Sequence, residues 1–178
     1  LTQEDRSAAL AALAAFLRGH AAAAEGLGEH LAQGVCAAVD GERDPRCLLR
    51  AFELVGLAAV QLEPHAVEAN AEELFDALSR YFPVRFTPPP GADKRPDAVT
   101  REQLVGGLRA AMLASPAFAA PCLALLLDKL DSLLHTSKMD SVDALAGAPA
   151  AFGAAAAPFA ERVWTALRKA ALPRAATG

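Results

Sequence analysis

The residues of this 178-residue chain with metal-binding side chains are four histidines and three cysteines. They are His20, His30, His65, His135, Cys36, Cys47 and Cys122. Zinc and iron–sulfur sites need three or four converging ligands, but these residues form no CxxC, CxxH or HxxxH pair. The helix-breaking stretch "DGERDP" also separates Cys36 from Cys47. We therefore expect semi-buried free thiols in a reducing compartment, with no bound metal or cofactor.

Covalent catalysis is not indicated either. The sequence contains no GxSxG motif, and its glycine pair 106–107 lies within a helical pattern, where close packing explains it better than phosphate binding. Four serines fall at expected helix starts or on solvent-facing positions, where capping explains them: Ser115, Ser132, Ser137 and Ser141. We expect no enzyme. A fragment of an enzyme would have to build its site around His65 or His135 with residues from elsewhere.

Acidic side chains crowd the turn between two expected helices. They are Asp128, Asp131, Asp140 and Asp143. We expect them to form a solvated helix face, and an acidic ridge for a partner is the alternative. The formal net charge of −4 and the isoelectric point near 5.6 argue against nucleic acid as the main partner, because phosphate binding needs a basic surface.

Apolar residues recur with a helical period along almost the whole chain, and no useful length alternates with the period of a strand. The expected helices are 25–39, 45–62, 64–82, 118–134, 137–147 and 158–171, with a first helix ending at Gly19 and another beginning after Thr100. Hydrophobic residues make up 53% of the chain, which is ample for a core. The sequence therefore predicts an all-α fold.

Local signals define several helix ends. Asp44 followed by Pro45 is typical of a helix start, and Thr100 with Gln103 predicts a capping box. In the expected helix 118–134, Leu133 and Leu134 continue an apolar stripe and are predicted to be buried.

Successive helices joined by short turns form either a compact bundle or an α-solenoid. The pairs 45–62/64–82 and 118–134/137–147 have the length of HEAT-type units. We favour a HEAT-like α-solenoid of stacked antiparallel helix pairs. The chain starts at Leu1, so it is expected to be a segment of a longer protein, with a frayed end at 172–178.

No membrane span is expected. The most extended apolar stretch, 146–160, is only mildly hydrophobic, and Pro149 and Pro158 interrupt it.

The segment 83–99 contains five prolines and is predicted to be a proline-rich inter-helix loop. Three interpretations are open: a structural connection, a polyproline ligand for an aromatic groove of a partner, and a site of phosphorylation at Thr87. Tyr81 and Phe82 complete a buried stripe, and Phe86 is placed to fold back on it. We therefore favour a connection that these three rings hold in place.

Several stretches together resemble the N-terminal domain of the MMS-nineteen family of HEAT-repeat proteins, named for methyl methanesulfonate sensitivity and nucleotide excision repair. They are "DPRCLLRAFELV" (44–55), "RYFPVRFTPPP" (80–90), "TREQLVGGLRAAMLASPAFAAPCLALLLDKLDS" (100–132) and "SKMDSVDAL" (137–145). The resemblance covers about residues 40–170, and it implies that residues 1–178 are part of the N-terminal HEAT-like domain of a longer protein. The chain departs from the family at "GADKRPD" (91–97) and at 144–160, which is diluted to alanine, glycine and proline.

The resemblance implies a scaffold or adaptor of cytosolic iron–sulfur cluster assembly that does not itself hold the cluster. Its partners would be other subunits of the targeting complex and client apoproteins such as DNA polymerases and helicases, in the nucleus and the cytoplasm. The alternative is a generic helical protein-interaction module in transcription and nucleotide excision repair, linked to TFIIH. Neither direct nucleic-acid binding nor membrane binding is expected. No catalytic, cofactor-binding, metal or partner-binding residue is carried over from the family.

Overall fold

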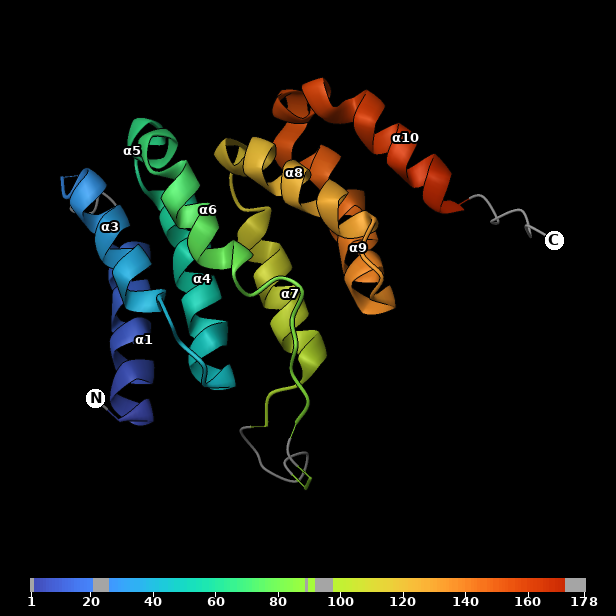
Figure 1. Ribbon diagram of the computed structural model, residues 1–178. Helices are drawn as coiled ribbons and strands as arrows, with labels where there is room; N and C mark the ends of the chain where they lie inside the picture. Colours follow the sequence, from blue (N-terminus) through green and yellow to red (C-terminus); the bar gives the residue numbers. More distant parts are fainter. Residues whose placement is uncertain (1, 21–25, 89, 92–97, 172–178) are drawn as a thin grey trace.

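The computed structural model describes residues 2–20, 26–88, 90–91 and 98–171, and every regular element within these ranges is a helix. The elements follow one another across the molecule from α1 to α10 (Figure 1). In chain order they are α1 (Gln3–Gly19), α3 (Gly28–Val39), α4 (Pro45–Gln61), α5 (Pro64–Ala69), α6 (Ala71–Ser79), α7 (Arg101–Met112), the 3₁₀ helix η2 (Pro116–Phe118), α8 (Ala119–Leu130), α9 (His135–Phe152), the 3₁₀ helix η3 (Gly153–Phe159) and α10 (Ala160–Ala171). The all-α prediction is confirmed.

The helices stack in two layers. One layer runs from α1 through α4 to α7, and the other runs from α3 through α6 to α8. Beyond them α9 packs on α8, and α10 packs on α8 and η3. Each helix thus contacts mainly its neighbours along the array, which is the arrangement of the predicted HEAT-like α-solenoid.

The predicted helix starts are confirmed. The Asp44 side chain accepts hydrogen bonds from the backbone N–H groups of Arg46 and Cys47, and Pro45 occupies the first position of α4. At the start of α7, the Gln103 N–H donates to the Thr100 hydroxyl at 3.2 Å, and the Thr100 N–H donates to the Gln103 side chain at 2.8 Å. These side chains satisfy backbone donors that have no partner within their helix.

The core lies between the two layers, and α4 is at its centre. Phe52, Leu54 and Val55 of α4 are almost completely buried. A Cβ atom added to Gly107 would lie 3.3 Å from the Leu49 side chain, whereas one added to Gly106 would meet nothing within 4 Å. Close packing therefore explains Gly107, which lets α7 approach α4, but it does not explain Gly106.

The prediction of a single helix over 64–82 is wrong in one respect. The chain forms two shorter helices there, α5 and α6, which meet at Asn70. The buried Asn70 amide donates to the Ala66 carbonyl at 2.8 Å. This side-chain hydrogen bond competes with the helical backbone pattern. The second helix, α6, ends at Ser79, so the aromatic residues Tyr81 and Phe82 lie beyond it.

The predicted burial of Leu133 and Leu134 is also wrong. α8 already ends at Leu130, and the exposed fractions of Leu133 and Leu134 are 99% and 49%. The N–H groups of Asp131 and Ser132 donate to carbonyls three residues back, which tightens the last turn and takes the chain out of the helix. The helical period thus continues in the sequence past the end of the helix itself.

α9 extends further than the predicted 137–147. It begins at His135, ends at Phe152 and includes Pro149, so the alanine-rich region that departs from the family is helical as well. Leu145, Ala148 and Phe152 are buried along this helix. Their packing outweighs the hydrogen bond that Pro149 removes.

The run His135–Ala171 includes an 18-residue window with a mean hydropathy of 1.2, so within the described residues one segment is long and apolar enough for a membrane span. The core helix of a soluble protein meets the same criterion, and the finding by itself assigns no membrane. Figure 1 shows that the chain turns over at η3, so α9 and α10 run in different directions.

Candidate partner-binding groove

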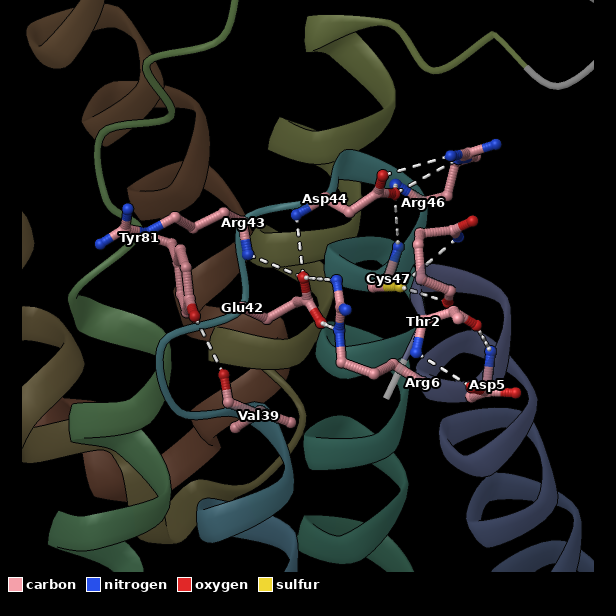
Figure 2. Close-up of polar contacts among 11 residues, drawn as sticks. Thr2, Asp5, Arg6, Val39, Glu42, Arg43, Asp44, Arg46, Cys47 and Tyr81 are labelled. Carbon is pink, nitrogen blue, oxygen red and sulfur yellow. Dashed lines mark hydrogen bonds and ion pairs between the residues drawn. The ribbon is translucent and has the colours of Figure 1, made fainter.

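The stretch that follows α6 is held in place by Tyr81. Its hydroxyl donates to the Val39 carbonyl at 3.0 Å, at the end of α3 (Figure 2). Its ring meets the Phe52 ring of α4 edge to face, with 5.5 Å between the centroids. Burial raises the pKa of the Tyr81 hydroxyl, which keeps the proton that this hydrogen bond needs. Tyr81 therefore joins three elements, α3, α4 and the start of the loop.

Arg101, the first residue of α7, fixes the next part of the loop. Its Nε donates to the Val84 carbonyl at 3.3 Å, and its Nη2 forms an ion pair with the Asp140 carboxylate of α9 at 2.5 Å. The Asp140 side chain is only 10% exposed. One guanidinium thus connects the loop with α7 and α9.

The described residues of 83–99 form no helix and lie between α6 and α7 along the chain. Phe82, Val84 and Phe86 are half-buried and pack against the core, while Thr87 is exposed. Residue 89 and residues 92–97 of this loop, like the predicted frayed end 172–178, lie outside the described residues.

A groove of about 380 Å³ opens beside this loop. Leu48, Phe52 and Leu104 form its apolar floor, and residues 80–86 form one wall. All charged residues in its described lining are arginines, namely Arg43, Arg80 and Arg85. The groove therefore offers an apolar surface and guanidinium groups together, a combination that a binding segment of a partner could use.

A buried carboxylate organises the turn on the other side of Tyr81. Glu42 accepts two hydrogen bonds from the Arg6 guanidinium, at 2.8 and 3.1 Å, and two more from the backbone N–H groups of Arg43 and Asp44, at 2.8 and 2.9 Å (Figure 2). The hydrogen bonds from Arg6 are the main cause that lowers the Glu42 pKa to about 2. The pair connects α1 with the turn between α3 and α4. It also fixes the backbone from which Arg43 extends toward Tyr81 (Figure 2).

The candidate metal ligands are dispersed. The four histidines are exposed and lie on different elements, at the end of α1, in α3, in α5 and at the start of α9. Burial raises the pKa of Cys36 to about 11 and that of Cys122 to about 12, which favours the thiol over the metal-binding thiolate. Among the described residues, no group of three or more His, Cys, Asp or Glu side chains is placed to hold a metal ion.

The predicted serine and aspartate positions are confirmed only in part. Ser115 caps η2 and Ser132 accepts a hydrogen bond from the Leu134 N–H, as expected. Ser137 and Ser141 are buried in α9 instead. They face inward because α9 packs this side against the neighbouring helices.

The predicted acidic cluster also contains both exposed and buried side chains. Asp128 and Asp131 are exposed and pair with Lys129 and Lys169, whereas Asp140 points inward to Arg101. The prediction of a solvated face is therefore wrong for Asp140, because a long-range ion pair takes this carboxylate out of the surface.

Comparison with known proteins places these features in a family. The family model MMS19_N, described as "Dos2-interacting transcription regulator of RNA-Pol-II", matches residues 1–173. The chain belongs to this MMS19 family. It is 34% identical over 170 residues to the MMS19 nucleotide excision repair protein homolog of Xenopus laevis and 35% identical to that of Mus musculus. Each alignment covers 95% of this chain and 16% of the relative. The Drosophila melanogaster MMS19 nucleotide excision repair protein is 32% identical, over 79% of this chain and 14% of its own length.

The resemblance predicted from the sequence is thus confirmed, and it extends further toward the N-terminus than the predicted residues 40–170. In this MMS19 family member, residues 80–86, part of the stretch that carries much of the resemblance, also build a wall of the arginine-lined groove. The aromatic and proline residues of this stretch stand out in the sequence, whereas its arginines do not. Arg43 lies 37 positions before Arg80, so their shared location depends on tertiary packing.

Replacing Arg101 with glutamine is expected to destabilise the protein by about 2 kcal/mol, because it leaves the buried Asp140 carboxylate without its charged partner. Urea denaturation followed by circular dichroism measures the effect. Arg168→Gln, at an exposed arginine of α10, is the matched control and should change stability by less than about 0.5 kcal/mol. Combining Arg101→Gln with Asp140→Asn should cost less than the sum of the single changes. Additive effects would contradict the proposed coupling.

Proposed function

We propose that this segment is part of a scaffold or adaptor of cytosolic iron–sulfur cluster assembly, which helps to deliver clusters to apoproteins of DNA replication, repair and transcription. The observation that carries the proposal is membership of the MMS19 family over residues 1–173. The stacked helices support it, because solenoids present extended surfaces to partner proteins. The partners would be other subunits of the targeting complex and client apoproteins, such as DNA polymerases and helicases, in the cytoplasm and the nucleus.

The segment would act by binding and not by catalysis. The exposed positions of His65 and His135 on separate elements, and the raised pKa values of the thiols, support this part of the proposal. Direct contact with nucleic acid or a membrane is not part of the proposed role.

Affinity capture tests the proposal. The full-length parent protein is compared with the same protein lacking residues 1–178, and the captured iron–sulfur apoproteins and targeting-complex subunits are quantified by mass spectrometry. We expect the loss of client apoproteins when the segment is absent. Unchanged capture of clients and complex subunits would contradict a role of this segment in client delivery.

The alternative is a helical interaction module in transcription or nucleotide excision repair. The names of the relatives and of the family model favour it, since they refer to nucleotide excision repair and to transcription. Loss of TFIIH subunits with unchanged iron–sulfur clients would support this alternative. Deleting residues 88–96 then shows whether the loop itself binds a partner, provided that the thermal unfolding of the protein is unchanged.

A further inference from the structure

The groove beside residues 80–86 differs in charge from the protein as a whole. The chain carries 21 acidic residues against 17 lysines and arginines, yet all charged side chains in the described lining of the groove are arginines. Guanidinium groups bind carboxylates through paired N–H donors in a fixed planar geometry. The groove therefore favours a ligand with negative charge.

The three arginines are not equally engaged within the protein. Arg80 forms ion pairs with Asp40 at 2.5 Å and with Asp76 at 2.8 Å, which hold its guanidinium in position at the rim. Within the described part of the chain, the guanidinium groups of Arg43 and Arg85 have no ion-pair or hydrogen-bond partner. These two exposed arginines are available to bind the carboxylates of another molecule.

The groove also has an apolar component. Leu48 is the half-buried residue of its floor, where Phe52 and Leu104 are only 2% and 1% exposed, and the half-buried Phe82 and Phe86 line its wall. The volume of about 380 Å³ lies within the range of pockets that enclose small ligands or parts of peptides, about 300–1,000 Å³. An apolar side chain on this floor would be flanked by arginines.

The walls are already fixed in the free protein. The Tyr81 hydroxyl is bonded to Val39, the Val84 carbonyl is bonded to Arg101, and the Arg43 N–H is bonded to the buried Glu42 carboxylate. A groove whose walls are ordered before binding loses less conformational entropy when a ligand enters. This rigidity distinguishes it from a chance depression between flexible loops.

We propose that this groove binds an extended acidic peptide segment in which aspartate or glutamate residues flank an apolar side chain. The carboxylates would contact Arg43 and Arg85, and the apolar side chain would lie against the half-buried Leu48, Phe82 and Phe86. The inference deepens the proposed adaptor function, since it names the kind of partner segment that one surface accepts, and it rests on that function for its biological context. Residues 80–86 are then part of a receptor surface.

A single-stranded nucleic acid is the competing anionic ligand, because aromatic and basic residues together also bind unpaired bases. A polyanion needs a basic stripe along several phosphates, whereas this groove has three arginines, one of which is already paired with two carboxylates. The net charge of −4 would repel a long polyanion more than a short acidic peptide. These features favour the peptide.

Fluorescence anisotropy tests the proposal with a short fluorescein-labelled peptide in which aspartates and glutamates flank a central phenylalanine. The double charge reversal Arg43→Glu/Arg85→Glu is expected to weaken binding by about tenfold or more. The matched control is Arg162→Glu/Arg168→Glu, which gives the same net charge at two exposed arginines of α10 outside the groove lining and should weaken binding by less than about twofold. Circular dichroism verifies that both variants are folded. If the reversal prevents folding, Arg43→Gln/Arg85→Gln replaces it.

Three comparisons can overturn the proposal. A peptide with asparagine and glutamine in place of its acids, or with alanine in place of phenylalanine, should bind more weakly, and equal binding of either would contradict the proposed chemistry. Equal weakening by the two charge reversals would show a general charge effect. If a single-stranded oligonucleotide displaces the labelled peptide at a lower concentration than the unlabelled peptide does, the groove binds nucleic acid instead. Because peptide binding is measured on the isolated protein, it can fail while client capture by the parent protein persists, and the reverse also holds.

Discussion

Phe118→Ala is expected to lower the free energy of unfolding by about 4 kcal/mol, because it removes a fully buried ring and leaves a cavity. The ring lies 5.8 Å from that of Phe75 in α6, centroid to centroid. Its short helix η2 contacts α6, α8, α9 and η3. Phe118 therefore belongs to the junction through which the C-terminal helices pack on the rest of the array.

Chemical denaturation followed by circular dichroism measures this loss. Trp164→Ala is the matched control, since this aromatic residue of α10 is 65% exposed and its removal should cost less than about 0.5 kcal/mol. Neighbouring units of a solenoid are coupled through their interfaces. We therefore also expect the Phe118 variant to unfold over a broader range of denaturant, as α8–α10 become less coupled to α1–α7. A loss as small as that of the control would contradict the proposed role of this junction.

Features that depend on neighbouring residues in the sequence are predicted well. The caps at Asp44 and Thr100 involve hydrogen bonds within two or three positions, and the structure contains both. The break between α5 and α6 at Asn70 is also local, yet the sequence does not predict it. An asparagine within an apolar pattern is compatible with a continuous helix. Only its buried side-chain hydrogen bond to Ala66 shows the competition with the backbone.

Features that depend on distant residues could not be predicted. Glu42 lies in a stretch that the sequence shows only as a turn, and its partner Arg6 is 36 positions away. The sequence predicts Asp140 on a solvated face, because it does not show that Arg101, 39 positions away, is the partner of this carboxylate. The exposure of Leu133 follows from where α8 ends, which the helical period alone does not determine. The candidate groove could not be predicted for the same reason, since its lining residues come from separate helices and a loop.

Glu42→Gln is expected to destabilise the protein by about 3 kcal/mol at neutral pH and much less in acid. The Glu42 side chain is 5% exposed, and its pKa is lowered from 4.5 to about 2 in the folded protein. A shift of this size corresponds to about 3 kcal/mol, since each pKa unit contributes about 1.4 kcal/mol. Glutamine has a similar shape but no charge, so it loses the ionic hydrogen bonds with Arg6.

The pH dependence follows from which state binds the proton. Between about pH 4.5 and pH 2, Glu42 is protonated in the unfolded chain but still ionised in the folded protein, so the unfolded state binds more protons and stability falls as the pH falls. The difference in unfolding free energy between wild type and Glu42→Gln should therefore be largest above about pH 5 and should nearly vanish near pH 2. Urea titrations at a series of pH values measure this difference, with Glu68→Gln, an exposed glutamate of α5, as the control for general charge effects. A difference that stays constant with pH would show that Glu42 stabilises the turn by its shape and neutral hydrogen bonds, and not as the ionised partner of Arg6.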